Sequence, residues 1–82
     1  MSKRVEVTAP MSGVFYRSPA PDQPPYVEVG DTVKKKQVLA LLETMKVFQK
    51  VKSPAAGKIV EIAAENEVPL GDGDLMFIIE TG

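Results

Sequence analysis

The sequence predicts an all-β fold, in which two small antiparallel sheets pack as a flattened barrel or sandwich with pseudo-two-fold symmetry. Three observations support this prediction. Short apolar or alternating runs are separated by proline and glycine turn signals. No segment has a helical pattern long enough to organise a fold. The two halves of the chain also resemble each other. At 82 residues, we expect one domain, 1–82, with one thin core.

Two pairs of segments reveal the internal repeat. Residues 9–15 resemble residues 53–59 at a separation of 44 positions, and residues 38–44 resemble residues 75–81 at a separation of 37 positions. A duplicated half-domain with an insertion in its first copy explains both separations. Chance similarity between two β-rich halves is the alternative.

Each expected strand is a short apolar or alternating run between turn signals. The segment from Ala63 to Glu67 could form a helical turn, but it is too short to be stable alone. The turn signals are Pro10, Gly13, Gly30, Pro54, Gly57, Pro69 and 71–73. In chain order, the expected strands are Arg4–Thr8, Gly13–Tyr16, Val38–Thr44, Val47–Lys52, Gly57–Ile62 and Leu75–Glu80.

The composition excludes several classes of function. The chain has no cysteine and no histidine, which argues against disulfides, thiolate nucleophiles, histidine-based triads and the usual zinc sites. We therefore expect no metal site and no catalytic residue. A net charge of −1 gives no attraction for nucleic acid. No apolar run approaches the ~20 residues that span a bilayer, and no signal peptide begins the chain, so we expect a cytoplasmic protein without a membrane partner.

The repeat gives Lys46 a distinctive position. If the halves are related by a pseudo-two-fold axis, the hairpin turn that contains Lys46 is the symmetry mate of the place where the two chain ends meet. Lysine and chain ends then lie at opposite poles. This geometry suits a carrier, whose reactive end faces a partner while its attached end leads away. The alternative is that Lys46 is an ordinary solvated lysine.

The hairpin register follows from a two-residue turn at Met45 and Lys46. Such turns usually place their central residues at positive φ, which suits neither side chain, so we expect local strain. One face of the hairpin would carry Glu43, Phe48, Lys50 and Lys52. The expected cross-strand pairs are Thr44 with Val47, Leu42 with Gln49 and Ala40 with Val51.

The segments 43–47 and 52–57 resemble the biotinyl and lipoyl attachment domains, small duplicated β-sandwiches that carry a prosthetic group on a hairpin lysine. In lipoyl domains an aspartate usually precedes this lysine, whereas in biotinyl domains a methionine does. Met45 therefore favours biotin, although Thr44 and the segment 53–57 fit lipoyl domains equally well. Val47 departs from the commonest biotinyl methionine.

The first half carries about eight residues that the second half lacks. Together with the preceding residues 15–17, this segment resembles the thumb of the biotin carboxyl carrier domains of bacterial and plastid acetyl-CoA carboxylases. Its four prolines restrict φ and limit the conformations of the loop. A plain proline-rich surface loop is the alternative. The thumb residues are Ser18, Pro19, Ala20, Pro21, Asp22, Gln23, Pro24 and Pro25.

The resemblance implies a non-catalytic carrier within a multi-subunit carboxylase. A biotin protein ligase would attach biotin to Lys46, with Glu43, Met45 and Val47 as ligase recognition residues. The ordinary lysine pKa of ~10.4 means that the ligase would help to deprotonate the amine. Biotin carboxylase would load the carboxyl group and a carboxyltransferase would unload it, with tethering to raise the effective concentration. The thumb favours acetyl-CoA carboxylase, and a plant parent chain would place the domain in the plastid stroma.

Several alternatives stay open from the sequence. The domain could serve another biotin-dependent carboxylase, carry lipoate for a 2-oxo acid dehydrogenase, or act as an unmodified adaptor. Glu43 could pair with Lys50 across the hairpin instead of contacting a ligase. Residues 34–36 are expected to form a solvated turn. Tyr16 and Arg17 could touch the cofactor or a partner, although packing is the simpler role for Tyr16. The initiating methionine fits a whole protein or an excised carrier end.

Overall fold

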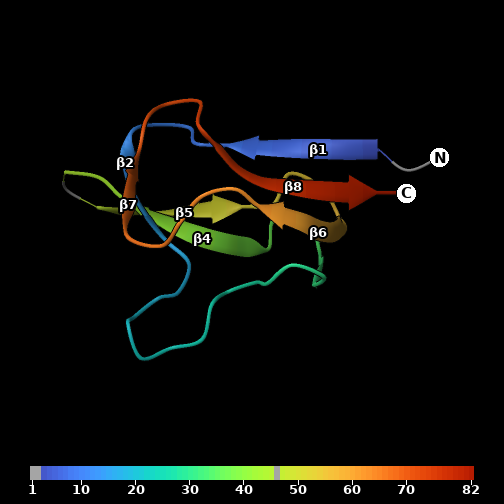
Figure 1. Ribbon diagram of the computed structural model, residues 1–82, viewed down its shortest axis with the longest axis horizontal. Coiled ribbons are helices and arrows are strands. Elements are labelled where there is room, and N and C mark those ends of the chain that lie inside the picture. The colour runs from blue at the N-terminus through green and yellow to red at the C-terminus, as the bar shows by residue number, and fades with distance from the viewer. Residues whose placement is uncertain (1–2, 46) are drawn as a thin grey trace.

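A computed structural model describes residues 3–45 and 47–82, and it confirms the all-β fold. Eight strands form two four-stranded antiparallel sheets (Figure 1). The first sheet has the order β1 (Lys3–Thr8), β8 (Leu75–Thr81), β6 (Gly57–Ile62), β3 (Thr32–Val33). The second has the order β5 (Phe48–Lys52), β4 (Val38–Glu43), β2 (Gly13–Tyr16), β7 (Val68–Leu70).

All six expected strands are present, with bounds that differ from expectation by at most one residue. The two short edge strands β3 and β7 were not expected. They are only two and three residues long, and β7 contains Pro69, which cannot donate to a ladder and is tolerated at an edge. Residues 63–67 form bends and a turn instead of a helical turn. Across the described ranges, no helix is long and apolar enough to cross a membrane.

The duplication is visible in the strand order. Strands β1 and β2 correspond to β5 and β6 at the separation of 44 positions, and β3 and β4 correspond to β7 and β8 at 37 positions. Exchanging each strand for its mate converts the order β1-β8-β6-β3 into β5-β4-β2-β7. Each sheet therefore contains strands from both halves, and neither half can form a sheet of this kind without the other.

The repeat also explains the left-handed backbone positions. Among the described residues other than glycine, positive φ occurs at Lys36 (73°) and Glu67 (66°). Their repeat mates are Gly73 (φ 88°) and Gly30 (φ 99°). Both halves therefore share these turns, and glycine occupies the position with positive φ in one copy of each turn. Residues 34–36 are exposed, as expected of a solvated turn.

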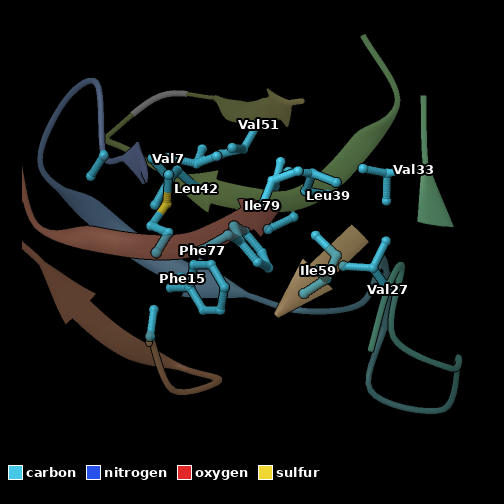
Figure 2. Close-up of a cluster of buried hydrophobic side chains, with 14 residues drawn as sticks. Val7, Phe15, Val27, Val33, Leu39, Leu42, Val51, Ile59, Phe77 and Ile79 are labelled. Carbon is cyan, nitrogen blue, oxygen red and sulfur yellow. The ribbon is translucent and has the colours of Figure 1, made fainter. Parts of the chain in front are cut away.

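The core lies between the two sheets and draws on both halves (Figure 2). The rings of Phe15 and Phe77 pack at its centre, with centroids 5.8 Å apart and a tilt of 53°. Full burial of such side chains stabilises the fold by roughly 1.5–3 kcal/mol each. The core side chains are Val7, Ala9, Phe15, Val27, Val33, Leu39, Ala40, Leu42, Val51, Ile59, Ala64, Met76, Phe77 and Ile79.

Two glycines at matching positions let neighbouring strands approach closely. A Cβ atom on Gly13 would lie 2.9 Å from the carbonyl oxygen of Glu43. A Cβ atom on Gly57 would clash more severely with the carbonyl oxygen of Glu80, and also with the Ile79 side chain at 2.8 Å. The glycines of the repeat therefore serve packing in both sheets.

The start of β1 and the end of β8 lie at one end of the molecule, and the end of β4 and the start of β5 lie at the other (Figure 1). Lys3 pairs with Thr81 where the chain ends meet. We call that region, with Arg4 and Glu80, the terminal pole, and the β4–β5 turn with Glu43 and Phe48 the hairpin pole. The opposite placement expected from the repeat is confirmed for the strands that flank the turn.

Candidate functional site

The hairpin pole has the predicted register. Leu42 pairs with Gln49, and Ala40 pairs with Val51. The Thr44 amide donates to the carbonyl oxygen of Val47 at 2.9 Å, and the Thr44 hydroxyl donates to the same oxygen at 3.1 Å. The two strands are thereby closed at the turn. Lys46 itself lies outside the described residues.

The residues that flank position 46 present apolar side chains to solvent. Met45 is 99% exposed, and Val47 and Phe48 are each more than half exposed. Met45 is not among the residues with positive φ, so the strain expected at this residue was wrong. Adjacent exposed apolar side chains are typical of a surface that another protein contacts.

Tyr16 contacts both strands of this hairpin. Its hydroxyl donates to Oε1 of Glu43 at 2.9 Å, and its ring packs against Phe48 with centroids 6.0 Å apart. The hydrogen bond to Glu43 raises the pKa of Tyr16, with smaller contributions from burial and the negative charges of Glu43 and Glu67. Lys50, the alternative partner of Glu43, lies opposite Leu41 in the register.

The thumb lies in the long loop between β2 and β3, the lower loop of Figure 1. Arg17 closes its base through three hydrogen bonds. The backbone amide of Arg17 donates to Oδ1 of Asn66 at 2.9 Å, and its carbonyl accepts from the Tyr26 amide at 2.8 Å. Its guanidinium Nη2 donates to the Val27 carbonyl at 3.2 Å. Val27 is buried in the core, so both ends of the loop are fixed to the sandwich.

The thumb itself has a local fold. The Ser18 hydroxyl donates to the Ala20 carbonyl at 2.9 Å, and the Gln23 amide donates to the same carbonyl at 3.1 Å. Ser18 and Ala20 are half-buried. The remaining thumb residues, Pro19, Pro21, Asp22, Gln23, Pro24 and Pro25, are exposed.

A cavity of about 160 Å³ lies between the thumb and the hairpin. A void of roughly 150 Å³ can hold a benzene-sized ring, so the cavity can accept a small ring group or several water molecules. Its wall is shared by the thumb, β2, β4, β5 and the turn after β6. The lining residues are Tyr16, Ser18, Pro19, Ala20, Pro21, Leu41, Phe48, Asn66 and Glu67.

Sequence reasoning missed the contribution of two of these residues, Leu41 and Asn66. Tyr16 was named as a residue that packs or that touches a cofactor or partner, and the structure shows it packing against Phe48 and bonded to Glu43. Leu41 is buried although it lies outside the core cluster, and the unbroken apolar run of its strand could have indicated that something covers the outer face. Asn66 lies 49 positions from Arg17, and no sequence pattern indicates this contact.

The described residues include no group of three or more acidic side chains that could hold a metal ion.

Taken with this site, the fold defines a prosthetic-group attachment domain. The family described as "Biotin-requiring enzyme" matches residues 5–79, and the chain belongs to this family. It is 43% identical over 74 residues to the biotin carboxyl carrier protein of acetyl-CoA carboxylase 1, chloroplastic, of Arabidopsis thaliana, an alignment covering 90% of this chain and 26% of the relative. It is 48% identical over 69 residues to the biotin carboxyl carrier protein of acetyl-CoA carboxylase of Streptococcus pyogenes, covering 82% and 42%.

A solved structure shares the architecture. The crystal structure of Kluyveromyces lactis urea carboxylase matches with a TM-score of 0.78 and 25% identity, covering 94% of this chain and 6% of that chain. The chain spans well under two thirds of the length of these relatives.

Proposed function

We propose that this chain is the biotin-carrying domain of an acetyl-CoA carboxylase, with biotin joined to Lys46 as an amide. The observation that carries the proposal is that β4 ends and β5 begins at the pole opposite the end of β8 (Figure 1), and the Glu-Thr-Met-Lys sequence of residues 43–46 connects these two strands in the chain. A group attached there can reach a partner's active site while the chain ends lead away from it.

Two features favour biotin over lipoate. Met45, which precedes Lys46, is fully exposed and available to a modifying enzyme. The thumb is fixed beside the hairpin and forms one wall of the cavity. The carrier proteins of acetyl-CoA carboxylase in Arabidopsis thaliana and Streptococcus pyogenes are both named for biotin, and this shared name supports the same cargo here.

The residues of the chain position the group and supply no catalysis. Lys46 provides the amine for the amide bond, and Glu43, Met45 and Val47 form the recognition surface for a biotin protein ligase. Biotin, when bound, supplies a ureido nitrogen that accepts a carboxyl group. The thumb, residues 18–25, limits the space around the hairpin on one side. The tether keeps the carried group at high effective concentration near each partner.

The proposed partners follow from this carrier role. A biotin carboxylase would load the carboxyl group and a carboxyltransferase would transfer it, as separate parts of a multi-subunit carboxylase. The relatives are named from a bacterium and from chloroplasts, so we place the domain in the bacterial cytoplasm or the plastid stroma. We propose that residues 1–82 act as one carrier domain.

Intact-mass spectrometry after co-expression with a biotin protein ligase tests the proposal. We expect a mass gain of one biotin that Lys46→Arg abolishes, because this lysine is the proposed sole nucleophile. Lys50→Arg is the matched control, since Lys50 is exposed on the same hairpin, and it should keep the gain. A lipoyl gain on co-expression with a lipoyl ligase would indicate the other carrier class. No modification by either ligase would indicate an adaptor.

A further inference from the structure

The duplication supplies an internal reference for the hairpin pole. Glu43 and Glu80 are repeat mates, and each lies near the end of its strand, Glu43 as the last residue of β4 and Glu80 as the residue before the last in β8. At the terminal pole, Glu80 faces Arg4 in the register and forms a salt bridge with it at 3.9 Å. At the hairpin pole, Glu43 faces Phe48 instead. The fold therefore accommodates a cross-strand ion pair at this position, but the hairpin pole has an aromatic ring there.

At the hairpin pole, the Glu43 carboxylate is contacted by Tyr16, which lies on the neighbouring strand β2. Its hydroxyl donates to Glu43 on β4, and its ring packs against Phe48 on β5, which lies beyond β4 in the sheet. The repeat mate of Tyr16 is Val60, whose side chain can make neither a hydrogen bond nor an aromatic contact. The three-residue cluster of Tyr16, Glu43 and Phe48 is thus a departure from the repeat and not a requirement of the sandwich.

The cluster is placed where it can influence Lys46. Glu43 precedes the lysine by three residues and Phe48 follows it by two. Glu43 is half-buried and Phe48 is mostly exposed, so both remain accessible to another protein. A carboxylate has a second oxygen that can accept further hydrogen bonds, and a hydrogen bond to the first oxygen fixes the direction in which the second one points.

We propose that Tyr16 is a positioning residue for modification of Lys46. It fixes the Glu43 carboxylate through its hydroxyl and the Phe48 ring through its own ring, in the arrangement that the modifying enzyme binds. This inference rests on the proposed function, because it assigns Tyr16 to the attachment reaction. Tyr16 acts through Glu43 and Phe48 and does not touch the reacting atoms.

Steady-state kinetics of biotinylation by a biotin protein ligase test the inference, with the 82-residue chain as the varied substrate. Tyr16→Phe keeps the ring and removes the hydroxyl. We expect KM for the carrier to rise roughly tenfold with kcat unchanged, as follows from loss of an interaction made equally in the bound and transition states. Tyr26→Phe is the control, because the Tyr26 ring packs against the core cluster, whereas the contacts with Glu43 and Phe48 are made by Tyr16, and this variant should keep both constants.

A double-mutant cycle separates positioning from general packing. Glu43→Gln should raise KM, and adding Tyr16→Phe to it should raise KM little further, because the two residues act through one hydrogen bond. Additive effects, an unchanged KM for Tyr16→Phe, or a fall in kcat alone would each overturn the inference. Unfolding of Tyr16→Phe, seen in its circular dichroism, would also overturn it. Absence of modification in the unaltered chain would instead refute the proposed function.

Discussion

The two poles of the sandwich share a backbone but differ in their side chains. At the hairpin pole the Thr44 hydroxyl donates to the Val47 carbonyl, and at the terminal pole the equivalent Thr81 hydroxyl donates to the Lys3 carbonyl at 3.4 Å. The strand register is also the same. Features common to both poles are therefore explained by the duplicated fold. Features found at one pole only require another reason, and we connect those at the hairpin pole with carrying a prosthetic group.

The loops that follow β2 and β6 show the same contrast. Residues 17–31 join β2 to β3 and include the thumb, whereas residues 63–67 join β6 to β7 by a short turn. The short loop also contributes Asn66, whose side chain accepts a hydrogen bond at the base of the long one. The insertion thus makes the outer faces of the two sheets unequal, and the cavity beside the hairpin results from this difference.

The largest predicted effect tests the shared part of the two poles. Gly57→Ala should lower the free energy of unfolding by about 3 kcal/mol and Gly13→Ala by about 1–2 kcal/mol, because an added Cβ overpacks the strand contact and the clash is worse at Gly57. Urea denaturation measures both. Gly71→Ala is the control, since its Cβ would meet only the Asp74 side chain at 3.6 Å. Equal losses at the two matched glycines would contradict the geometry.

The next effect concerns the base of the thumb. Arg17→Met should lower the free energy of unfolding by about 1 kcal/mol, because it removes the hydrogen bond to the Val27 carbonyl. It should also speed hydrogen exchange of the Tyr26 amide, which donates to the Arg17 carbonyl. Hydrogen-exchange mass spectrometry or NMR would detect this change. Unaltered protection of that amide would show that the thumb does not depend on the guanidinium.

A titration tests the cluster that only the hairpin pole possesses. In a Tyr26→Phe background Tyr16 is the remaining tyrosine, so its absorbance reports one group. Its pKa should lie above the ordinary value of ~10, because the hydroxyl donates to the Glu43 carboxylate, and Glu43→Gln should lower it. Glu80→Gln is the control, and it should leave the pKa of Tyr16 unchanged.

The raised pKa of Tyr16 determines how its contribution to folding stability changes with pH. The pKa of Tyr16 is higher in the folded chain than in the unfolded chain. The stability that the protonated Tyr16 side chain adds to the fold is therefore fully present below the unfolded pKa, and it is lost as pH rises through the folded pKa. A Tyr16 pKa that stays the same after Glu43→Gln would contradict the hydrogen bond.

The smallest effect belongs to the terminal pole. Arg4→Ala should lower the free energy of unfolding by at most about 0.5 kcal/mol, because the salt bridge with Glu80 is long and exposed. High salt should remove even this difference by screening the pair. Thermal melts at low and high ionic strength measure it. A loss above about 1 kcal/mol would show that the two poles differ less than their side chains suggest.

The hydrophobic pattern and the repeat predicted much of the fold. They gave the six long strands, the hairpin register from Ala40 to Val51 and the opposite placement of the two poles. They missed β3 and β7, which are too short to leave a pattern, and they wrongly placed strain at Met45. The repeat could have located the left-handed residues Lys36 and Glu67, because glycine marks their mates in the other half.

By itself, the sequence predicted the six longer strands and the pairing of the two hairpin strands, because side-chain alternation, turn residues and internal similarity are local or repeated signals. The tertiary structure alone decided which side chains surround the hairpin. Tyr16 reaches Glu43 across 27 positions and Arg17 reaches Asn66 across 49, and such contacts depend on how sheets and loops pack. The physical reason is that packing selects these partners by distance in space, which no local pattern records.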